Sequence, residues 1–179
     1  MEESMGQEKH TPECQKYDAL KLENLICFPL YACARELIKL YKPFLDRIDL
    51  TYTQFITMIV LWEKESLTSK ELGQALFLDS GTLTPLLKKL EVKGYLTRKR
   101  SAEDERNLIV TITDAGQALR RPAKEIYHEM VRQFKLDSED AQELYRLLYK
   151  MLRSEKQIPE DFLSEITLQY IDEETDEKD

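Results

Sequence analysis

Cys27 is the side chain whose type and position best suit redox chemistry. It lies near the N-terminus of a helix that we expect from about Asp18 or Asn24 to Tyr41, with Pro43 ending it. A helix macrodipole favours an anion there, and therefore the thiolate form of the cysteine. A thiolate attacks a peroxide and becomes a sulfenic acid. The alternative is that Cys27 is an inert core residue, which is the commoner role of a cysteine on an apolar helix.

Two neighbours qualify this interpretation. Pro29 removes a helical donor and disfavours helical geometry at Phe28, so the helix either starts late or bends there. Cys33 lies six residues beyond Cys27, about 9 Å up the axis and on another face, so a bridge between the two is not expected. Cys14, in a segment without periodicity, stays open as a resolving thiol.

A second chemistry is suggested by hydroxyls and positive charges that follow one another between residues 80 and 106. Short hydroxyls on a helix can contact DNA base edges or phosphates, and lysine and arginine neutralise phosphates. The DNA-contact candidates are Ser80, Thr82, Thr84, Lys88, Lys89, Arg98, Lys99, Arg100 and Arg106, with Asp104 placed to hold the Arg106 guanidinium. The alternative is a solvated charged face with a salt-bridged turn.

The net charge of -8 does not contradict this interpretation, because ten acidic and two basic residues lie between Ser154 and Asp179. The remainder of the chain therefore sums to zero. The stretch from Lys88 to Arg100 carries six basic residues against Glu91 alone. Salt screens distant charges beyond about 10 Å, so the local charge decides phosphate contact.

The elements that would position these residues can be predicted from periodicity and caps. Thr51 and Gln54 form one expected capping box, and Thr68 and Glu71 another. Helices are expected at about 51–63, 68–77, 80–93, 114 onward with a disturbance at Pro122, and 138–153. Phe55, Ile59 and Trp62 are expected on one side of the first of these, and Ser138 is expected to cap the last. Strands are expected at 95–100 and 108–113, joined by a charged tip. A short last helix is expected from Pro159.

This order predicts a mostly α (α+β) fold: a winged helix-turn-helix at about 51–113 with a helical dimerisation region. Another small α+β domain with the same order is the alternative. Leu83, Leu86, Leu87 and Leu90 are expected to face the core.

Composition excludes several other classes. The 179-residue chain has 42% hydrophobic residues but only five glycines, which argues against a glycine-rich loop enzyme. No apolar run approaches the ~20 residues of a membrane helix, and the polar N-terminus is unlike a signal peptide. A cytoplasmic protein without membrane contact is expected. No nucleotide-binding or zinc-protease motif is present, and His10 and His128 are too few for a dedicated metal site.

The segment that best resembles a known family is DSGTLTPLLKKLEVKGYLTRKRSAEDERNLIVTITDAG, with its Asp104-Glu105-Arg106 core. It is similar to the recognition helix and wing of the MarR family. The segments LENLICFPLYACAREL and YKPFLDRIDLTYTQF resemble the organic-hydroperoxide sensors of that family. The resemblance covers roughly residues 22–153, leaving a tail at 1–17 and an acidic extension at 154–179.

The resemblance implies a repressor without cofactor or enzymatic activity. It implies that Cys27 is the redox-sensing residue and that Tyr31, Tyr41 and Tyr52 support its thiolate, in part across a homodimer. Helices at about 18–45 and 114–153 would form that dimer, which would bind double-stranded DNA with an inverted repeat. Organic hydroperoxide would be the signal. Since no late cysteine is present, a small cellular thiol would capture the sulfenic acid, or the sulfenic acid would go to higher oxidation.

Two rival hypotheses remain. In the first, the chain is a repressor of the same fold that responds to a phenolic or apolar-anion ligand, with Cys27 incidental. In the second, the chain is a small thiol peroxidase, for which the basic wing has no use. The acidic extension is either a solvated tail or a competitor of DNA for the basic wing.

Overall fold

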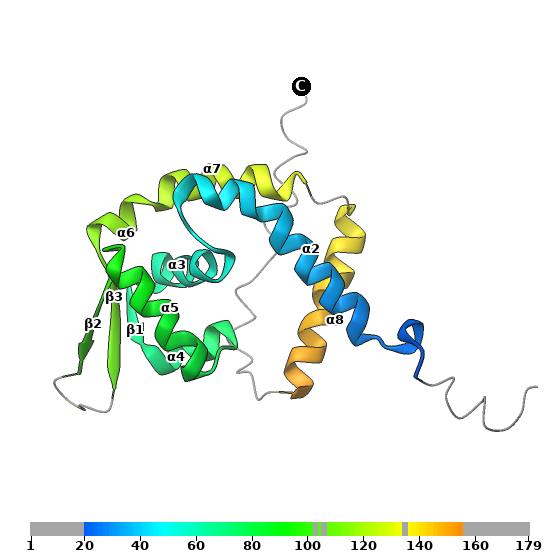
Figure 1. Ribbon diagram of the computed structural model, residues 1–179, viewed down its shortest axis with the longest axis horizontal. Coiled ribbons are helices and arrows are strands. Elements are labelled where there is room, and N and C mark those ends of the chain that lie inside the picture. Colours follow the sequence, from blue (N-terminus) through cyan, green and yellow to red (C-terminus); the bar gives the residue numbers. More distant parts are fainter. Residues whose placement is uncertain (1–19, 102–103, 105–106, 134–135, 156–179) are drawn as a thin grey trace, which may run out of the picture. The chain divides into compact units, whose positions relative to one another are not determined.

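The computed structural model describes residues 20–101, 104, 107–133 and 136–155 (Figure 1). The chain divides into two compact units, residues 1–131 and 132–179. The first unit contains η1 (Leu22–Asn24), α2 (Cys27–Leu45), η2 (Asp46–Ile48), α3 (Tyr52–Lys64), β1 (Ser66–Thr68), α4 (Ser69–Leu76), α5 (Ser80–Val92), β2 (Leu96–Arg100), β3 (Leu108–Ile112), α6 (Asp114–Ala118) and α7 (Arg120–Val131). The second contains α8 (Ser138–Glu155). The predicted mostly helical fold with a small sheet is confirmed.

Helices α3, α4 and α5 begin where the cap residues predict. Thr51 and Gln54 form a complete capping box at α3, and Thr68 and Glu71 form another at α4. The Asp79 carboxylate accepts from the backbone N–H of Thr82 and caps α5. These caps satisfy amide groups that the first helical turn leaves unpaired, so they fix where each helix starts.

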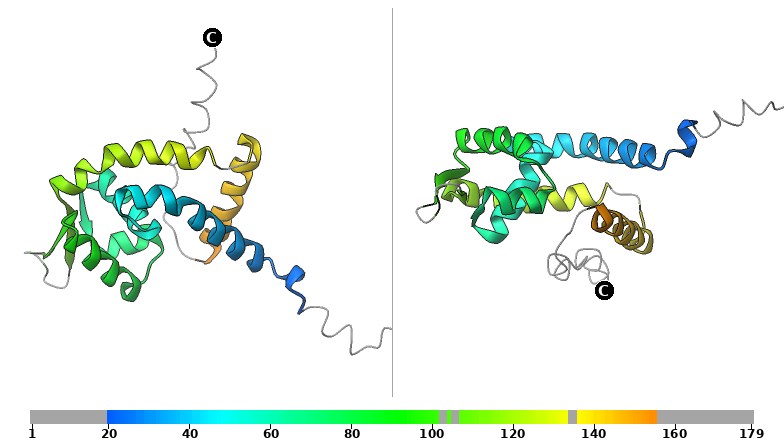
Figure 2. Two further views of the ribbon diagram at one scale, coloured as in Figure 1. Left: turned by 45° about the horizontal axis from the view of Figure 1, so that its top comes forward. Right: turned by 90° about the horizontal axis from the view of Figure 1, so that it is seen from below.

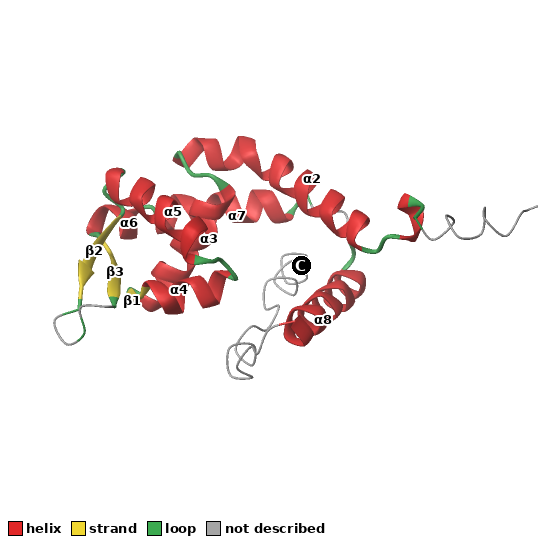
Figure 3. Ribbon diagram, turned by 60° about the horizontal axis from the view of Figure 1, so that its bottom comes forward, coloured by secondary structure: helices red, strands yellow, loops and turns green. Residues whose placement is uncertain are grey.

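The wing follows α5 through a left-handed glycine, Gly94, with φ +77°. Such a backbone conformation ends a helix with little strain only at glycine. Strands β2 and β3 pair antiparallel, from Leu96 opposite Ile112 to Arg100 opposite Leu108. Figure 3 shows the strands at one end of the first unit, beside α4 and α6.

A third strand, β1, was not predicted. It adds to the other edge of β3, with Leu67 opposite Val110, and gives the order β1-β3-β2. Three residues are too few to show an alternating pattern. Its position depends on Glu65, whose φ of +59° turns the chain out of α3 and whose carbonyl accepts from Ile112 N–H at 2.9 Å.

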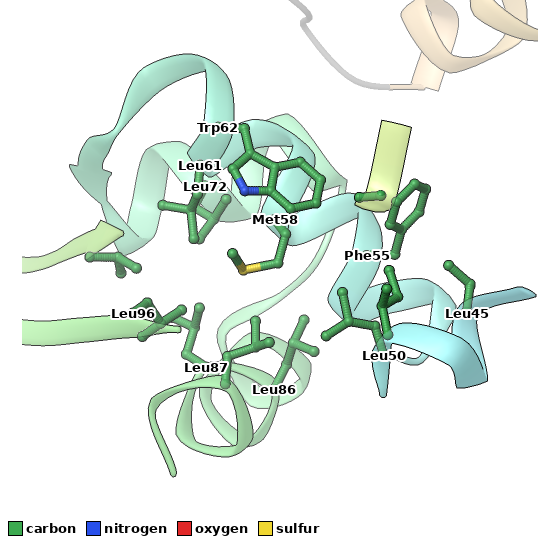
Figure 4. Close-up of a cluster of buried hydrophobic side chains, with 14 of the residues drawn as sticks. Leu45, Leu50, Phe55, Met58, Leu61, Trp62, Leu72, Leu86, Leu87 and Leu96 are labelled. Carbon is green, nitrogen blue, oxygen red and sulfur yellow. The ribbon is translucent and has the colours of Figure 1, made fainter. Parts of the chain in front are cut away.

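The core lies between α3, α5 and the sheet (Figure 4). The four predicted inward leucines of α5 are all buried, with Leu90 fully so. Trp62 packs edge-to-face on Phe55 at 6.3 Å and donates through Nε1 to the Gly116 carbonyl. The prediction that Ile59 shares the buried side of α3 is wrong, since it is 41% exposed.

The two ends of α2 show how the helix accommodates Pro29 and Pro43. It starts late, at Cys27, so Pro29 occupies the first turn, where its missing N–H has no helical acceptor to lose. The predicted end at Pro43 is wrong, because the helix continues to Leu45. Leu45 is 1% exposed, and its burial offsets the one hydrogen bond that an internal proline removes.

Two further helix boundaries differ from the sequence prediction. The disturbance expected at Pro122 appears as a break at Leu119 between α6 and α7, because the proline ring excludes the carbonyl four residues earlier. The predicted cap Ser138 is wrong: it is the first residue of α8, and the Asp137 carboxylate caps the helix by accepting from Asp140 N–H.

Among the described residues, no helix combines the length and apolarity needed to span a membrane. The predicted tail 1–17, Cys14, Arg106, the helix from Pro159 and residues 156–179 of the acidic extension lie outside the described residues.

Candidate nucleic-acid interface and sensing thiol

The three predicted hydroxyls lie exposed on the first turns of α5. Thr82 Oγ1 donates to Asp79 Oδ2 at 3.0 Å, and Thr84 Oγ1 donates to the Ser80 carbonyl at 2.7 Å. Both threonine hydroxyl hydrogens are therefore used inside the helix, and only oxygen lone pairs remain for an outside partner. Within the described residues the Ser80 hydroxyl has no such bond and keeps its donor.

Four of the predicted basic residues are exposed, two on α5 and two on β2. Lys88 and Lys89 lie on α5, on the side opposite its buried leucines, and Lys99 and Arg100 lie at the end of β2. A helix and a hairpin that both present cations can contact the phosphates on either side of a groove.

Arg98 has a different environment from these four. Its guanidinium donates to Glu91 Oε2 from Nε at 3.0 Å and from Nη2 at 2.6 Å, and its backbone N–H donates to Glu91 Oε1 at 3.0 Å. The Arg98 hydrogen bond lowers the pKa of Glu91. The pair links the end of α5 to the base of the wing, and it neutralises the Arg98 charge locally.

At the wing tip the structure describes Ser101, Asp104 and Asn107. The Asn107 N–H donates to the Asp104 carbonyl at 2.9 Å, and Asn107 Nδ2 lies 3.3 Å from Asp104 Oδ2. The predicted pair between Asp104 and Arg106 stays a prediction, because Arg106 is outside the described residues.

The thiol of Cys27 is exposed at the first residue of α2. No side chain caps this helix end, where the N-cap is Ile26; the Phe28 N–H donates to the Leu25 carbonyl at 3.0 Å, and Pro29 has no N–H. The helix dipole favours an anion at this position. Within the described part of the chain the thiol has no hydrogen-bond partner.

The predicted tyrosines are not gathered around Cys27 within one chain. Tyr31, one turn on, is 60% exposed, with the Arg35 guanidinium 5.6 Å from its ring centre. Tyr41 lies fourteen residues further along the same helix than Cys27, a rise of about 21 Å. Its ring is 6.1 Å from that of Tyr52, and the two pack against the core.

The Tyr41 phenol is held neutral by its surroundings. Burial is the largest cause that raises its pKa, and the neighbouring Tyr52 and Tyr127 add to it. A neutral phenol is a hydrogen-bond donor, so the Tyr41–Tyr52 pair can donate to an anion brought to it from outside this chain.

Comparison with known proteins places this arrangement in a family. The model of the transcriptional regulators SarA and Rot matches residues 39–121. The organic hydroperoxide resistance transcriptional regulator of Bacillus subtilis is 46% identical over 139 residues, which cover 78% of this chain and 95% of that protein. The chain belongs to the MarR family.

Other MarR-type relatives agree. The regulator SarZ of Staphylococcus saprophyticus is 43% identical over 127 residues, covering 71% of this chain and 87% of that protein. The solved structure of reduced AbfR bound to DNA is similar with a TM-score of 0.65 and 32% identity, over 78% of this chain and 97% of that one. As a MarR-family chain, this protein is a DNA-binding transcription regulator of the winged-helix type.

Sequence reasoning missed two residue roles in this MarR-type lobe. Glu91 was counted only as an opposing charge, although its spacing of seven from Arg98 across a helix end and a turn is a usable signal. Lys93 was counted only as part of the basic stretch, whereas the structure ties it to Asp49 across 44 residues. In the described ranges, no group of acidic, histidine and cysteine side chains could hold a metal ion.

Proposed function

We propose that this regulator is a repressor that releases its operator when an organic hydroperoxide oxidises Cys27. The observation that carries the proposal is the position of Cys27: exposed, at the uncapped N-terminus of α2, in a chain 46% identical to an organic hydroperoxide resistance regulator. The protein acts as a stoichiometric switch and not as an enzyme, and a reducing cytoplasm would keep the thiol ready.

The chemical step uses one thiolate and one hydroperoxide. The Cys27 sulfur attacks the terminal peroxide oxygen, the S–O bond forms and the O–O bond breaks. The alkoxide leaves and takes a proton, giving an alcohol and a cysteine sulfenic acid. A small cellular thiol then attacks this sulfur, forming a mixed disulfide and releasing water. Cys33 is six residues further along the same helix, which favours this route over an internal disulfide.

A homodimer would bring the thiolate and the tyrosine pair together. Tyr41 lies about 21 Å from Cys27 along α2, and the Tyr52 ring packs beside that of Tyr41, so a second copy is needed to place the pair near this thiol. Figure 2 shows the N-terminal part of α2 extending past the winged lobe, residues 52–112. This part of α2 and the segment that precedes it carry large apolar side chains that are exposed in the single chain: Leu20, Leu22, Leu25 and Ile26 before the helix, and Phe28 and Tyr31 on it.

Helix α8, in the second unit, has the same property. Its large exposed apolar residues are Leu144, Leu147, Met151 and Leu152. Exposed apolar faces of this size are typical of association surfaces. The dimer would place the two α5 helices, as recognition helices, about one DNA turn, ~34 Å, apart over an inverted repeat.

Oxidation at Cys27 would remove the thiolate that the tyrosine donors stabilise and add bulk at the dimer surface. A differential stability of a few kcal/mol between two dimer arrangements is enough to shift a bound population to a free one. Loss of charge-assisted hydrogen bonds has this order of magnitude.

The test is operator binding by wild type, Cys27→Ser and Cys33→Ser, with the probe taken from an inverted repeat upstream of the protein's own gene. Cumene hydroperoxide is added and followed by dithiothreitol. We expect release and recovery in wild type and in Cys33→Ser, and persistent binding in Cys27→Ser. Tight binding that ignores peroxide in all three would contradict the thiol switch and favour a small-molecule ligand. Rapid peroxide turnover would instead indicate a thiol peroxidase.

A further inference from the structure

The recognition helix is attached at its C-terminal end to the turn that terminates α2. Lys93 is the C-cap residue of α5, and its ammonium donates to the backbone carbonyl of Asp49. The same ammonium forms an ion pair with Asp49, with 2.9 Å between Nζ and Oδ2. The Lys93 side chain is only 25% exposed, whereas that of Asp49 is 82% exposed. The lysine is therefore the less exposed partner of the contact.

The position of Asp49 explains why a cation is stabilised there. Asp49 follows η2 in a left-handed conformation, φ +51°, and Leu50 N–H donates back to the Leu45 carbonyl at 3.1 Å. Backbone carbonyls at a helix end carry partial negative charge and lack helical donors. Lys93 thus acts as a C-terminal cap of α2–η2 that is supplied by a different helix.

The η2 turn is held rigidly on its other sides. Leu45, Ile48 and Leu50 are buried in the core, and Figure 4 shows Leu50 and Leu86 of α5 converging in the same part of it. Arg47 Nη1 contacts Glu129 Oε2 of α7 at 2.6 Å. A displacement of the C-terminal end of α2 is therefore passed to its neighbours instead of being absorbed by a loose loop.

We propose that Lys93 is a positioning residue that couples α2, which begins with Cys27, to the recognition helix. A change at the start of α2 shifts the helix axis, moves η2, and through the Lys93–Asp49 contact changes the setting of α5. The inference rests on the proposed thiol switch for its physiological signal, but the mechanical link is a property of the first unit itself.

The test compares the full-length protein with Lys93→Met, which keeps the apolar stem and removes the ammonium, and with Lys93→Arg, which keeps a cation. Lys124→Met, an exposed lysine of α7, is the control for loss of one positive charge. The first readout is the ratio of the oxidised to the reduced Kd for the operator. We expect this ratio to fall by about fivefold or more in Lys93→Met. Lys93→Arg and Lys124→Met should keep the wild-type ratio.

The second readout needs no oxidant. Because coupling is reciprocal, operator binding at α5 should slow amide hydrogen exchange at residues 45–50 in wild type and not in Lys93→Met. If wild type ignores peroxide, the thiol switch fails and this second readout alone decides the inference. Equal exchange protection in wild type and Lys93→Met, or an unchanged Kd ratio in a peroxide-responsive protein, would overturn the coupling role.

Discussion

At the scale of single residues, the proposed DNA-facing surface contains two kinds of cation: those available to phosphates, and one that is paired with a carboxylate of the same surface. Lys88, Lys89 and Lys99 project from the helix and the strand, whereas Arg98 is bound through three donors to Glu91. The sequence predicts Arg98 as a DNA contact, whereas its ion pair with Glu91 favours a positioning role. The two roles differ in their dependence on salt.

Arg98→Gln and Lys88→Gln should differ in the salt dependence of their operator binding. Removal of one phosphate contact makes the negative slope of log Kobs against log salt less steep by about 0.9, and we expect this change for Lys88→Gln. Arg98→Gln should weaken binding on the order of tenfold with the slope unchanged, because the wing loses its orientation and not a phosphate partner. A fluorescence titration from 50 to 300 mM salt measures both. A reduced slope for Arg98→Gln would restore it to the phosphate contacts.

The Glu91–Arg98 pair also predicts a pH dependence. The pKa of Glu91 is lowered in the folded protein, so its ion pair stabilises the fold above the ordinary glutamate pKa of about 4.3. That contribution is lost as the pH falls through the lowered value. Urea melts between pH 7 and pH 3.5 should therefore show a steeper acid loss of stability in wild type than in Glu91→Gln. Parallel curves would show that the pair does not contribute.

At the scale of elements, α6 is packed closely against the start of the wing. Thr113 Oγ1 donates to the Gly94 carbonyl and Thr113 N–H donates to the Tyr95 carbonyl. A Cβ atom at Gly116 would lie 2.1 Å from that Tyr95 oxygen. Backbone meets backbone here, so neither side can move aside cheaply.

We therefore expect Gly116→Ala to destabilise the protein by about 2–3 kcal/mol, because the added methyl forces α6 away from the strand. Trp62→Phe should cost about 2–3 kcal/mol, since it keeps an aromatic ring near Phe55 but deletes the donor to Gly116 and leaves part of the indole volume empty. Denaturant midpoints at constant m-value measure both. Equal stability of Gly116→Ala and wild type would mean that α6 is not closely packed.

At the scale of the whole molecule, the apolar part of α2 is left uncovered by the single chain. Phe28→Glu places a charge on that surface without disturbing the core, as Phe28 is 41% exposed. If two copies meet there, the variant should remain folded, become monomeric and bind the operator roughly a hundredfold more weakly, because two half-sites no longer act together.

Ile59→Glu on α3 is a matched control, since Ile59 is also 41% exposed. Sedimentation velocity with circular dichroism gives association and folding in the same samples. A dimeric Phe28→Glu with normal operator binding would exclude this part of α2 from the interface.

Sequence reasoning succeeded where one local signal fixes an element. The caps at Thr51, Thr68 and Asp79 and the leucines of α5 predict the helix-turn-helix directly. It failed where tertiary packing decides the bounds of an element. Burial of Leu45 stabilises the continuation of α2 beyond Pro43, and β1 forms because it can pair with the free edge of β3. Within the site, the exposure of Cys27 agrees with the chemistry assigned to it. The distance between Cys27 and Tyr41 could not be predicted, because it depends on α2 being one continuous helix from Cys27 to Leu45.

The internal hydrogen bonds of Thr82 and Thr84 have a consequence for the bases that face α5. With their hydrogens committed to Asp79 and Ser80, these hydroxyls offer only an acceptor and a methyl group. In the major groove, an acceptor matches the exocyclic amino group of adenine or cytosine, and a methyl group matches that of thymine. An A·T pair presents both partners together, whereas the guanine edge offers only acceptors. If α5 is the recognition helix of a dimer, as we propose, its half-sites should be rich in A·T pairs opposite its first two turns.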